Sequence, residues 1–139
     1  MIKKVNSIIS ATWIYTADKD NTLLNDHTIV ISEDQIFDIL PTKDVFDKYE
    51  ADDVFALSDH IITPGLINNH THAAMSLLKG YANDLPLKSW LEDHIWPAEK
   101  LHMCENFVKD GSLIAIAEMI KSGTTTFNDM YFYPSQTAE

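Results

Sequence analysis

The stretch Thr63-Pro-Gly-Leu-Ile-Asn-Asn-His-Thr-His72 marks the point where the pattern of the sequence changes. Thr63-Pro64-Gly65-Leu66 predicts a type II turn, because proline presets φ at the second position and glycine accepts a positive φ at the third. Residues 66–70 then have the composition of a β-strand. His70 and His72 are two residues apart, so on a strand both imidazoles project from the same face. Two imidazoles converging at a strand end are suited to bind one divalent metal ion.

The residues that follow predict helices and a second strand. A helical stretch at 73–79 ends at Gly80. A second helix, 86–96, begins at a proline, and Pro97 is expected to stop it. A long helix at 105–121 leads to a β-branched strand at 124–128. Its apolar stripe consists of Leu113, Ile116, Ala117 and Ile120. Strand, helices and strand form a βαβ unit, which belongs to a parallel sheet.

Residues 1–62 read differently, as short strands joined by turns. Residues 18–21 predict a turn, and residues 42–51 predict a short helix. The expected strands are 7–15, 27–32, 35–40, 53–57 and 60–62. These residues predict the N-terminal part of a small β-sandwich domain, and residues 63–139 predict the first βαβ portion of a barrel. Two parallel strands cannot close a barrel, so we expect the 139 residues to be part of a longer polypeptide.

Composition limits the possible partners. The chain has 45% hydrophobic and 22% charged residues, the balance of a globular protein. Its net charge is −11, from 21 acidic residues and 10 basic residues that are all lysine. This charge argues against binding to nucleic acid or to an anionic membrane surface, and it favours a small neutral or zwitterionic substrate. A single cysteine, Cys104, and the lack of an apolar run of ~20 residues predict a cytoplasmic protein.

Three further stretches make the sequence recognisable: Leu77-Leu-Lys-Gly-Tyr-Ala-Asn-Asp-Leu-Pro86, Trp90-Leu-Glu-Asp-His-Ile-Trp-Pro-Ala-Glu99 and Gly123-Thr-Thr-Thr-Phe-Asn-Asp-Met130. Together with the Pro-Gly entry and the His-x-His pair, they resemble the amidohydrolase superfamily. Within it, the resemblance points to the 5-methylthioadenosine/S-adenosylhomocysteine deaminases, a branch that also contains triazine hydrolases. The resemblance covers the whole chain.

The resemblance implies an α/β fold, a (β/α)8 TIM-type barrel preceded by a small β-sandwich, with the barrel incomplete in this chain. It also implies one Zn²⁺, or another transition metal, held by the His-x-His pair, two histidines from strands five and six and an aspartate from strand eight. Metal-bound hydroxide would attack C6 of an adenine ring, and ammonia would leave. A glutamate near strand five and the strand-eight aspartate would shuttle protons. Of these groups only His70 and His72 lie within the chain, so the 139 residues alone are expected to be inactive.

Two more positions match the branch. The resemblance implies that Glu99 binds the ribose hydroxyls and that Trp90 lines the nucleoside pocket. On the residues alone, Glu99 fits a solvated helix end as well, and Trp90 fits a core position of its helix. Asp129 stands at the end of the second strand, where a helix cap is the more frequent role.

Three functions therefore stay open. The first is hydrolytic deamination of 5-methylthioadenosine or S-adenosylhomocysteine. The second is another reaction on the same scaffold: deamination of guanine or cytosine, or removal of chlorine from a triazine. The third is a non-catalytic, truncated piece that serves in binding or assembly. The oligomeric state is also open, a homo-oligomer included.

Overall fold

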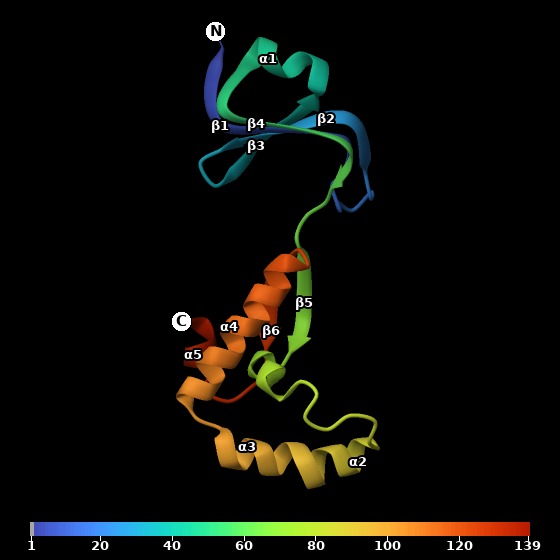
Figure 1. Ribbon diagram of the computed structural model, residues 1–139. Coiled ribbons are helices and arrows are strands. Elements are labelled where there is room, and N and C mark those ends of the chain that lie inside the picture. Colours follow the sequence, from blue (N-terminus) through green and yellow to red (C-terminus); the bar gives the residue numbers. More distant parts are fainter. Residues whose placement is uncertain (1) are drawn as a thin grey trace. The chain divides into compact units, whose positions relative to one another are not determined.

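A computed structural model describes residues 2–139 (Figure 1). Contacts between residues divide the chain into two compact units, the residues up to Pro64 and Gly65–Glu139. The first unit is one four-stranded sheet with the strand order β3-β2-β1-β4. Strand β1 pairs antiparallel with β2 and parallel with β4. The strands are β1 (Lys3–Tyr15), β2 (Leu23–Ser32), β3 (Gln35–Pro41) and β4 (Tyr49–Ile62).

Buried side chains of the first unit form two clusters, and helix α1 (Val45–Lys48) belongs to the one that contains Val45. A 3-10 turn, η1 (Thr42–Asp44), and the short helix α1 connect β3 to β4. Val45 is fully buried and brings α1 onto the strands. The cluster around it consists of Val5, Ile8, Val30 and Leu40. Burial of these branched side chains is what fixes the register of β1 against β2, because a shift by one residue would turn them to the other face.

Two expectations for this unit need correction. The helix predicted at 42–51 ends at Lys48, because residues 49–51 pair with Lys3, Lys4 and Val5 of β1. The strands predicted at 53–57 and 60–62 are one strand, β4, with an irregular register between Ala11 and Trp13 of β1. The predicted β-sandwich stays a prediction, since residues 2–64 form one sheet and a sandwich requires a second sheet packed on the first.

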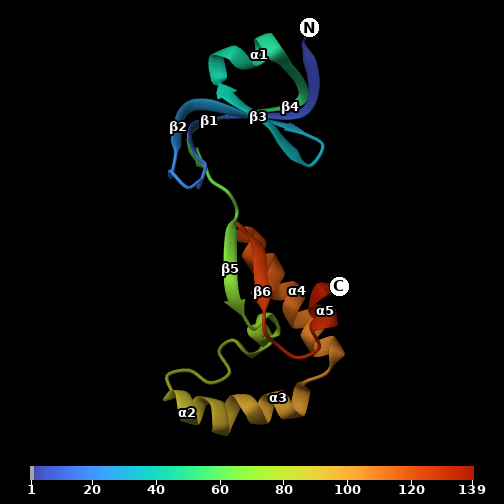
Figure 2. The same ribbon diagram turned by 180° about the vertical axis from the view of Figure 1, so that it is seen from behind.

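The second unit contains the predicted βαβ arrangement, which is confirmed. Strands β5 (Leu66–Thr71) and β6 (Thr124–Asp129) pair in parallel, and helix α4 (Glu105–Lys121) lies alongside them in both views (Figures 1 and 2). The 3-10 helix η2 (Ala73–Leu78) follows β5 directly, and α5 (Pro134–Ala138) follows β6. Among residues 2–139, none of the helices combines the length and the apolar character needed to cross a bilayer.

Between η2 and α4 runs a helical arm, residues 87–102. It consists of α2 (Leu87–Ser89), the π-helical turn η3 (Trp90–Ile95) and α3 (Trp96–His102), drawn as one continuous helix in Figure 1. The expectation that Pro97 ends this helix is therefore wrong. Pro97 occupies the first turn of α3, right after the wide π turn. Proline is tolerated in a first turn, since that position needs no N–H donor.

Pro64 and Gly65 lead the chain into β5, but not through the predicted type II turn. A type II turn requires a positive φ at Gly65, whereas the glycines with positive φ are Gly80 and Gly123. The amide of Leu66 donates to the carbonyl oxygen of Gly123 at 2.9 Å, so the chain enters β5 directly. A Cβ atom at position 65 would collide with the side chain of Thr125 on β6. Glycine is needed there for close approach of the two strands.

Helix α4 has the predicted bounds but packs through another face. Its buried residues are Val108, Gly111, Ser112 and Ala115. Of the predicted apolar stripe, Leu113 and Ile120 are exposed by 56% and 68%. The small side chains on the buried face let η2 approach, and a Cβ atom at Gly111 would strike the backbone of Ala74.

Gly111→Ala tests this close packing. In most helix interiors glycine to alanine stabilises by up to about 1 kcal/mol. Here the added methyl group would push η2 away, so we expect the free energy of unfolding to fall by about 1–3 kcal/mol. Urea denaturation measures the change, with Asp110→Ala on the exposed side of α4 as control, expected within about 0.5 kcal/mol of the unmodified protein. A Gly111→Ala variant as stable as the control would contradict the packing.

Candidate metal centre

His70 and His72 occupy the C-terminal end of β5 and the residue after it. Their Nε2 atoms are 3.3 Å apart, and their rings meet edge to face with centroids 5.1 Å apart. Both side chains are exposed. The predicted convergence of the two imidazoles on one point is therefore present in the geometry.

The separation of the two nitrogens fits a shared metal ion. In a tetrahedral site each Zn–N bond is about 2.0–2.1 Å long, which places two ligand nitrogens about 3.3 Å from each other. The distance between the Nε2 atoms of His70 and His72 matches this value. The separation of the two Nε2 atoms is therefore that of two ligands of one zinc-sized ion.

A backbone hydrogen bond sets the tautomer of His72. Its Nδ1 atom lies 2.6 Å from the carbonyl oxygen of Met130, just after β6. A carbonyl oxygen can only accept, so Nδ1 carries the proton and Nε2 keeps the lone pair that a metal requires. The amide of Met130 in turn donates to the carbonyl oxygen of Thr71 at 3.0 Å. The ends of β5 and β6 are thus joined at the histidine pair.

Asp129 supports the same segment from β6. Its Oδ1 atom accepts the amide N–H of Ala73 at 2.7 Å, and its Oδ2 atom accepts a long hydrogen bond from Thr137 of α5 at 3.5 Å. The predicted role as the cap of a following helix is wrong, because Tyr133 is the residue before α5 and Asp129 instead accepts the amide of Ala73 at the start of η2. Asp129 therefore fixes the backbone right after His72. Residues 2–139 contain no group of three or more His, Cys, Asp or Glu side chains placed to hold a metal ion together.

A pocket of about 480 Å³ opens beside the histidine pair. It brings together three of the four residues singled out in the sequence: His72, Trp90 and Glu99. His70 adjoins the pocket through its contact with His72. The rest of the lining is mostly apolar and includes Met75, Leu91, Ile95, Trp96, Met130, Tyr131 and Phe132. Metal-ligand candidates, an aromatic wall and one carboxylate thus share a single cavity.

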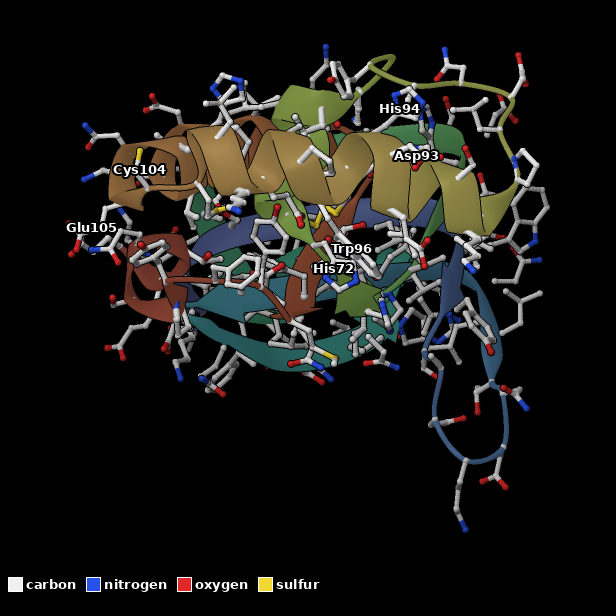
Figure 3. All side chains as sticks on the ribbon, turned by 90° about the horizontal axis from the view of Figure 1, so that it is seen from below. His72, Asp93, His94, Trp96, Cys104 and Glu105 are labelled. Carbon is white, nitrogen blue, oxygen red and sulfur yellow. The ribbon has the colours of Figure 1, made fainter. Side chains whose placement is uncertain are left out.

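Seen from below, with the helical arm running across the picture, the side chains divide around this pocket (Figure 3). His72 and Trp96, which both line it, lie together near the middle of Figure 3. Cys104 and Glu105 lie at one end of the helical arm, away from His72 (Figure 3). His94 packs edge to face on Tyr81, with ring centroids 6.3 Å apart. These residues take no part in the pocket.

Glu99 is held by a residue that the sequence reasoning missed. The hydroxyl of Tyr131 donates to Oε1 of Glu99 at 2.6 Å, and both side chains are half-buried. Burial and the bond to Glu99 raise the pKa of Tyr131 well above its usual range, so the phenol stays protonated and remains a donor. Its ring centroid lies 6.0 Å from that of His72. The available signal was its position two residues after the end of β6, at the edge of the sheet where the histidines also lie.

Comparisons with known proteins agree with this arrangement. The model of the amidohydrolase family matches residues 61–139. The 5-methylthioadenosine/S-adenosylhomocysteine deaminase of Saccharophagus degradans is 47% identical over 131 residues, 94% of this chain and 29% of the relative. The 5'-deoxyadenosine deaminase of Methanosarcina acetivorans is 48% identical over 132 residues, 95% of this chain and 29% of that protein. This chain spans less than a third of the length of these relatives.

Solved structures show the same likeness. An adenosine deaminase from Xanthomonas campestris, with bound zinc, superposes with a TM-score of 0.95 at 37% identity over 99% of this chain and 31% of its own. An atrazine chlorohydrolase from Arthrobacter aurescens, complexed with zinc, reaches 0.78 at 20% identity over 95% of this chain and 32% of its own, a likeness of fold alone.

The parallel β5–β6 pair with its connecting helices defines an α/β arrangement. The chain belongs to the amidohydrolase family, as the resemblance implied.

Asp129 offers a test of how the histidine pair is held. We expect Asp129→Ala to weaken zinc binding about 10- to 100-fold, as loss of an outer hydrogen-bond partner commonly does, because the backbone after His72 loses its anchor. Asp129→Asn keeps an acceptor for the Ala73 amide and should lose much less zinc affinity. Competition with a zinc chelator, on the protein expressed from its complete reading frame, measures both. Equal affinities for the two variants would contradict the anchoring role.

Proposed function

We propose that the chain is part of a metal-dependent hydrolytic deaminase of adenosine-type nucleosides, with 5-methylthioadenosine and S-adenosylhomocysteine as the intended substrates and ammonia as a product. The observation that carries the proposal is one pocket with a metal-ligand candidate, His72, on its wall and a carboxylate, Glu99, held by a tyrosine. Its volume of about 480 Å³ falls in the range of small-molecule sites. Relatives that are 42–48% identical carry the names of deaminases for such nucleosides.

His70 and His72 would hold the metal, with zinc as the first candidate because two solved neighbours contain it. A bound zinc ion supplies hydroxide at neutral pH by lowering the pKa of its water to about 7. Two imidazoles leave a four-coordinate shell incomplete, and we propose that further protein ligands and the proton-shuttling carboxylates come from outside residues 1–139. Alone, these 139 residues are then inactive.

Glu99 would bind the ribose of the substrate. A carboxylate can accept the hydrogens of two neighbouring hydroxyls, which suits a 2',3'-diol. Trp90 forms part of the aromatic wall and would contact the nucleoside. Its half-buried side chain lines the cavity, which supports this role over that of a core residue. The absence of arginine in the chain agrees with a substrate recognised here through hydroxyls rather than phosphates.

The wider architecture is part of the same proposal. We infer that β5 and β6 are the first two strands of a (β/α)8 barrel and that residues 2–62 belong to a small β-sandwich. Their likeness to solved amidohydrolases supports both inferences. The net charge of −11 supports an enzyme that binds neither nucleic acid nor membranes, and the single cysteine supports a cytoplasmic location. Self-association into a homo-oligomer is compatible with the exposed apolar face of α4.

A substrate panel tests the proposal. The protein from its complete reading frame, loaded with zinc, is mixed with 5-methylthioadenosine, S-adenosylhomocysteine, adenosine, guanine, cytosine and atrazine. We expect ammonia release and loss of adenine absorbance with the three adenosine compounds. Turnover of guanine, cytosine or atrazine without turnover of any adenosine compound would refute the proposal in favour of another reaction on the scaffold.

Glu99→Gln tests the ribose contact. Weakening the hydrogen bonds to a charged acceptor should raise KM for adenosine about tenfold or more, with a smaller change in kcat. Zinc content should stay unchanged, because Glu99 lies outside the histidine pair. Glu105→Gln, at an exposed position of the neighbouring helix, is the matched control and should leave KM as it is. An unchanged KM in Glu99→Gln would remove Glu99 from the substrate site.

A further inference from the structure

The pocket contains one hydrogen bond between side chains that come from distant parts of the chain. Glu99 lies on α3, and Tyr131 lies in the segment after β6. The Tyr131 hydroxyl donates to Oε1 of Glu99 at 2.6 Å, a short and charge-assisted bond. Within residues 2–139, Oε2 of Glu99 has no side-chain donor. One oxygen is engaged with protein, and the other stays available to a ligand.

The same segment also holds the histidine pair. Met130 accepts the Nδ1 proton of His72 through its carbonyl oxygen, and the next residue, Tyr131, donates to Glu99. Two consecutive residues therefore connect the metal-ligand candidate to the carboxylate. Because Met130 and Tyr131 share one planar peptide unit, the two hydrogen bonds together restrict how far the two groups can separate. Packing of the Tyr131 ring near the His72 ring, at 6.0 Å between centroids, restricts it further.

Without this bond Glu99 would have little to orient it. Helix α3 fixes only the position of the Glu99 Cα atom. The rest of the side chain can adopt several staggered conformations. The cavity on its other side is wide, about 480 Å³ in total. A hydrogen bond from a half-buried phenol selects one of these conformations before the ligand arrives, which lowers the ordering cost of binding.

We propose that Tyr131 is a positioning residue that pre-orients Glu99 toward the ribose hydroxyls of the substrate. The inference rests on the proposed function, since it takes Glu99 as the acceptor of those hydroxyls. Tyr131 acts through Glu99, because its hydroxyl hydrogen is already donated to Oε1 of Glu99. The consequence is a selectivity for nucleosides with an intact 2',3'-diol, set by a residue that need not contact the diol.

The test compares two substrates in the protein from its complete reading frame. Adenosine has both ribose hydroxyls, and 2',3'-dideoxyadenosine has neither. Tyr131→Phe keeps the ring against His72 and removes only the hydroxyl. Tyr133→Phe is the matched control, because the Tyr133 hydroxyl has no hydrogen-bond partner among residues 2–139. Zinc content and melting temperature are measured for each variant.

We expect Tyr131→Phe to raise KM for adenosine about tenfold, the loss of one hydrogen bond to a charged group, while kcat stays within about twofold. KM for 2',3'-dideoxyadenosine should not change, and Tyr133→Phe should behave as the unmodified protein with both substrates. In a Glu99→Gln background, Tyr131→Phe should add little, because the two residues act as one unit.

Five results would overturn the inference, and they are distinguishable from one another. Tyr131 would have a structural role only if Tyr131→Phe raised KM equally for both substrates or left KM for adenosine unchanged. The same conclusion would follow if Tyr131→Phe lost zinc or thermal stability. Equal KM values for the two substrates in the unmodified protein would remove the ribose contact itself. No turnover of any adenosine compound by the unmodified protein would refute the proposed function, and the inference with it.

Discussion

The hydrogen bond from Nδ1 of His72 to the carbonyl oxygen of Met130 joins the ends of two parallel strands at the place where the chemistry is expected. It depends on the register of β5 against β6, which brings Thr71 opposite Asp129. In return it fixes the imidazole in one tautomer with Nε2 directed at the Nε2 atom of His70. The fold and the candidate metal site therefore share one constraint. Pairing of β5 with β6 positions the carbonyl oxygen of Met130, and the hydrogen bond to this oxygen orients the imidazole of His72.

That constraint extends into the pocket through neighbouring residues. Asp129 precedes Met130 and anchors η2, while Tyr131 follows it and holds Glu99. Three successive residues, the last of β6 and the two that follow it, thus organise the backbone beyond His72, its ring and the carboxylate. Loops at the C-terminal ends of parallel strands carry function in many α/β proteins, because a rigid sheet positions them.

Local signals in the sequence sufficed to predict part of the fold and of the candidate site. The bounds of α4 at 105–121 follow from its periodicity and from the Ser122-Gly123 end, and the spacing of His70 and His72 gave their shared face. The rest depends on contacts between distant residues. Pro97 is accommodated by a π turn, Gly65 is needed for the approach of Thr125, and α4 buries Gly111 against Ala74 instead of its apolar stripe. Tyr131 gave no periodic or motif signal, since its role is visible only when β6 is placed beside α3.

The central claim is that both histidines present Nε2 to one metal ion, with His72 oriented by Met130. Anomalous diffraction at the zinc edge, from crystals of the protein expressed from its complete reading frame, tests it most directly. The account predicts a single peak about 2.0–2.1 Å from Nε2 of both His70 and His72, with the bond between Nδ1 of His72 and Met130 retained. Zinc bound through Nδ1 of His72, or a peak away from the histidine pair, would contradict it.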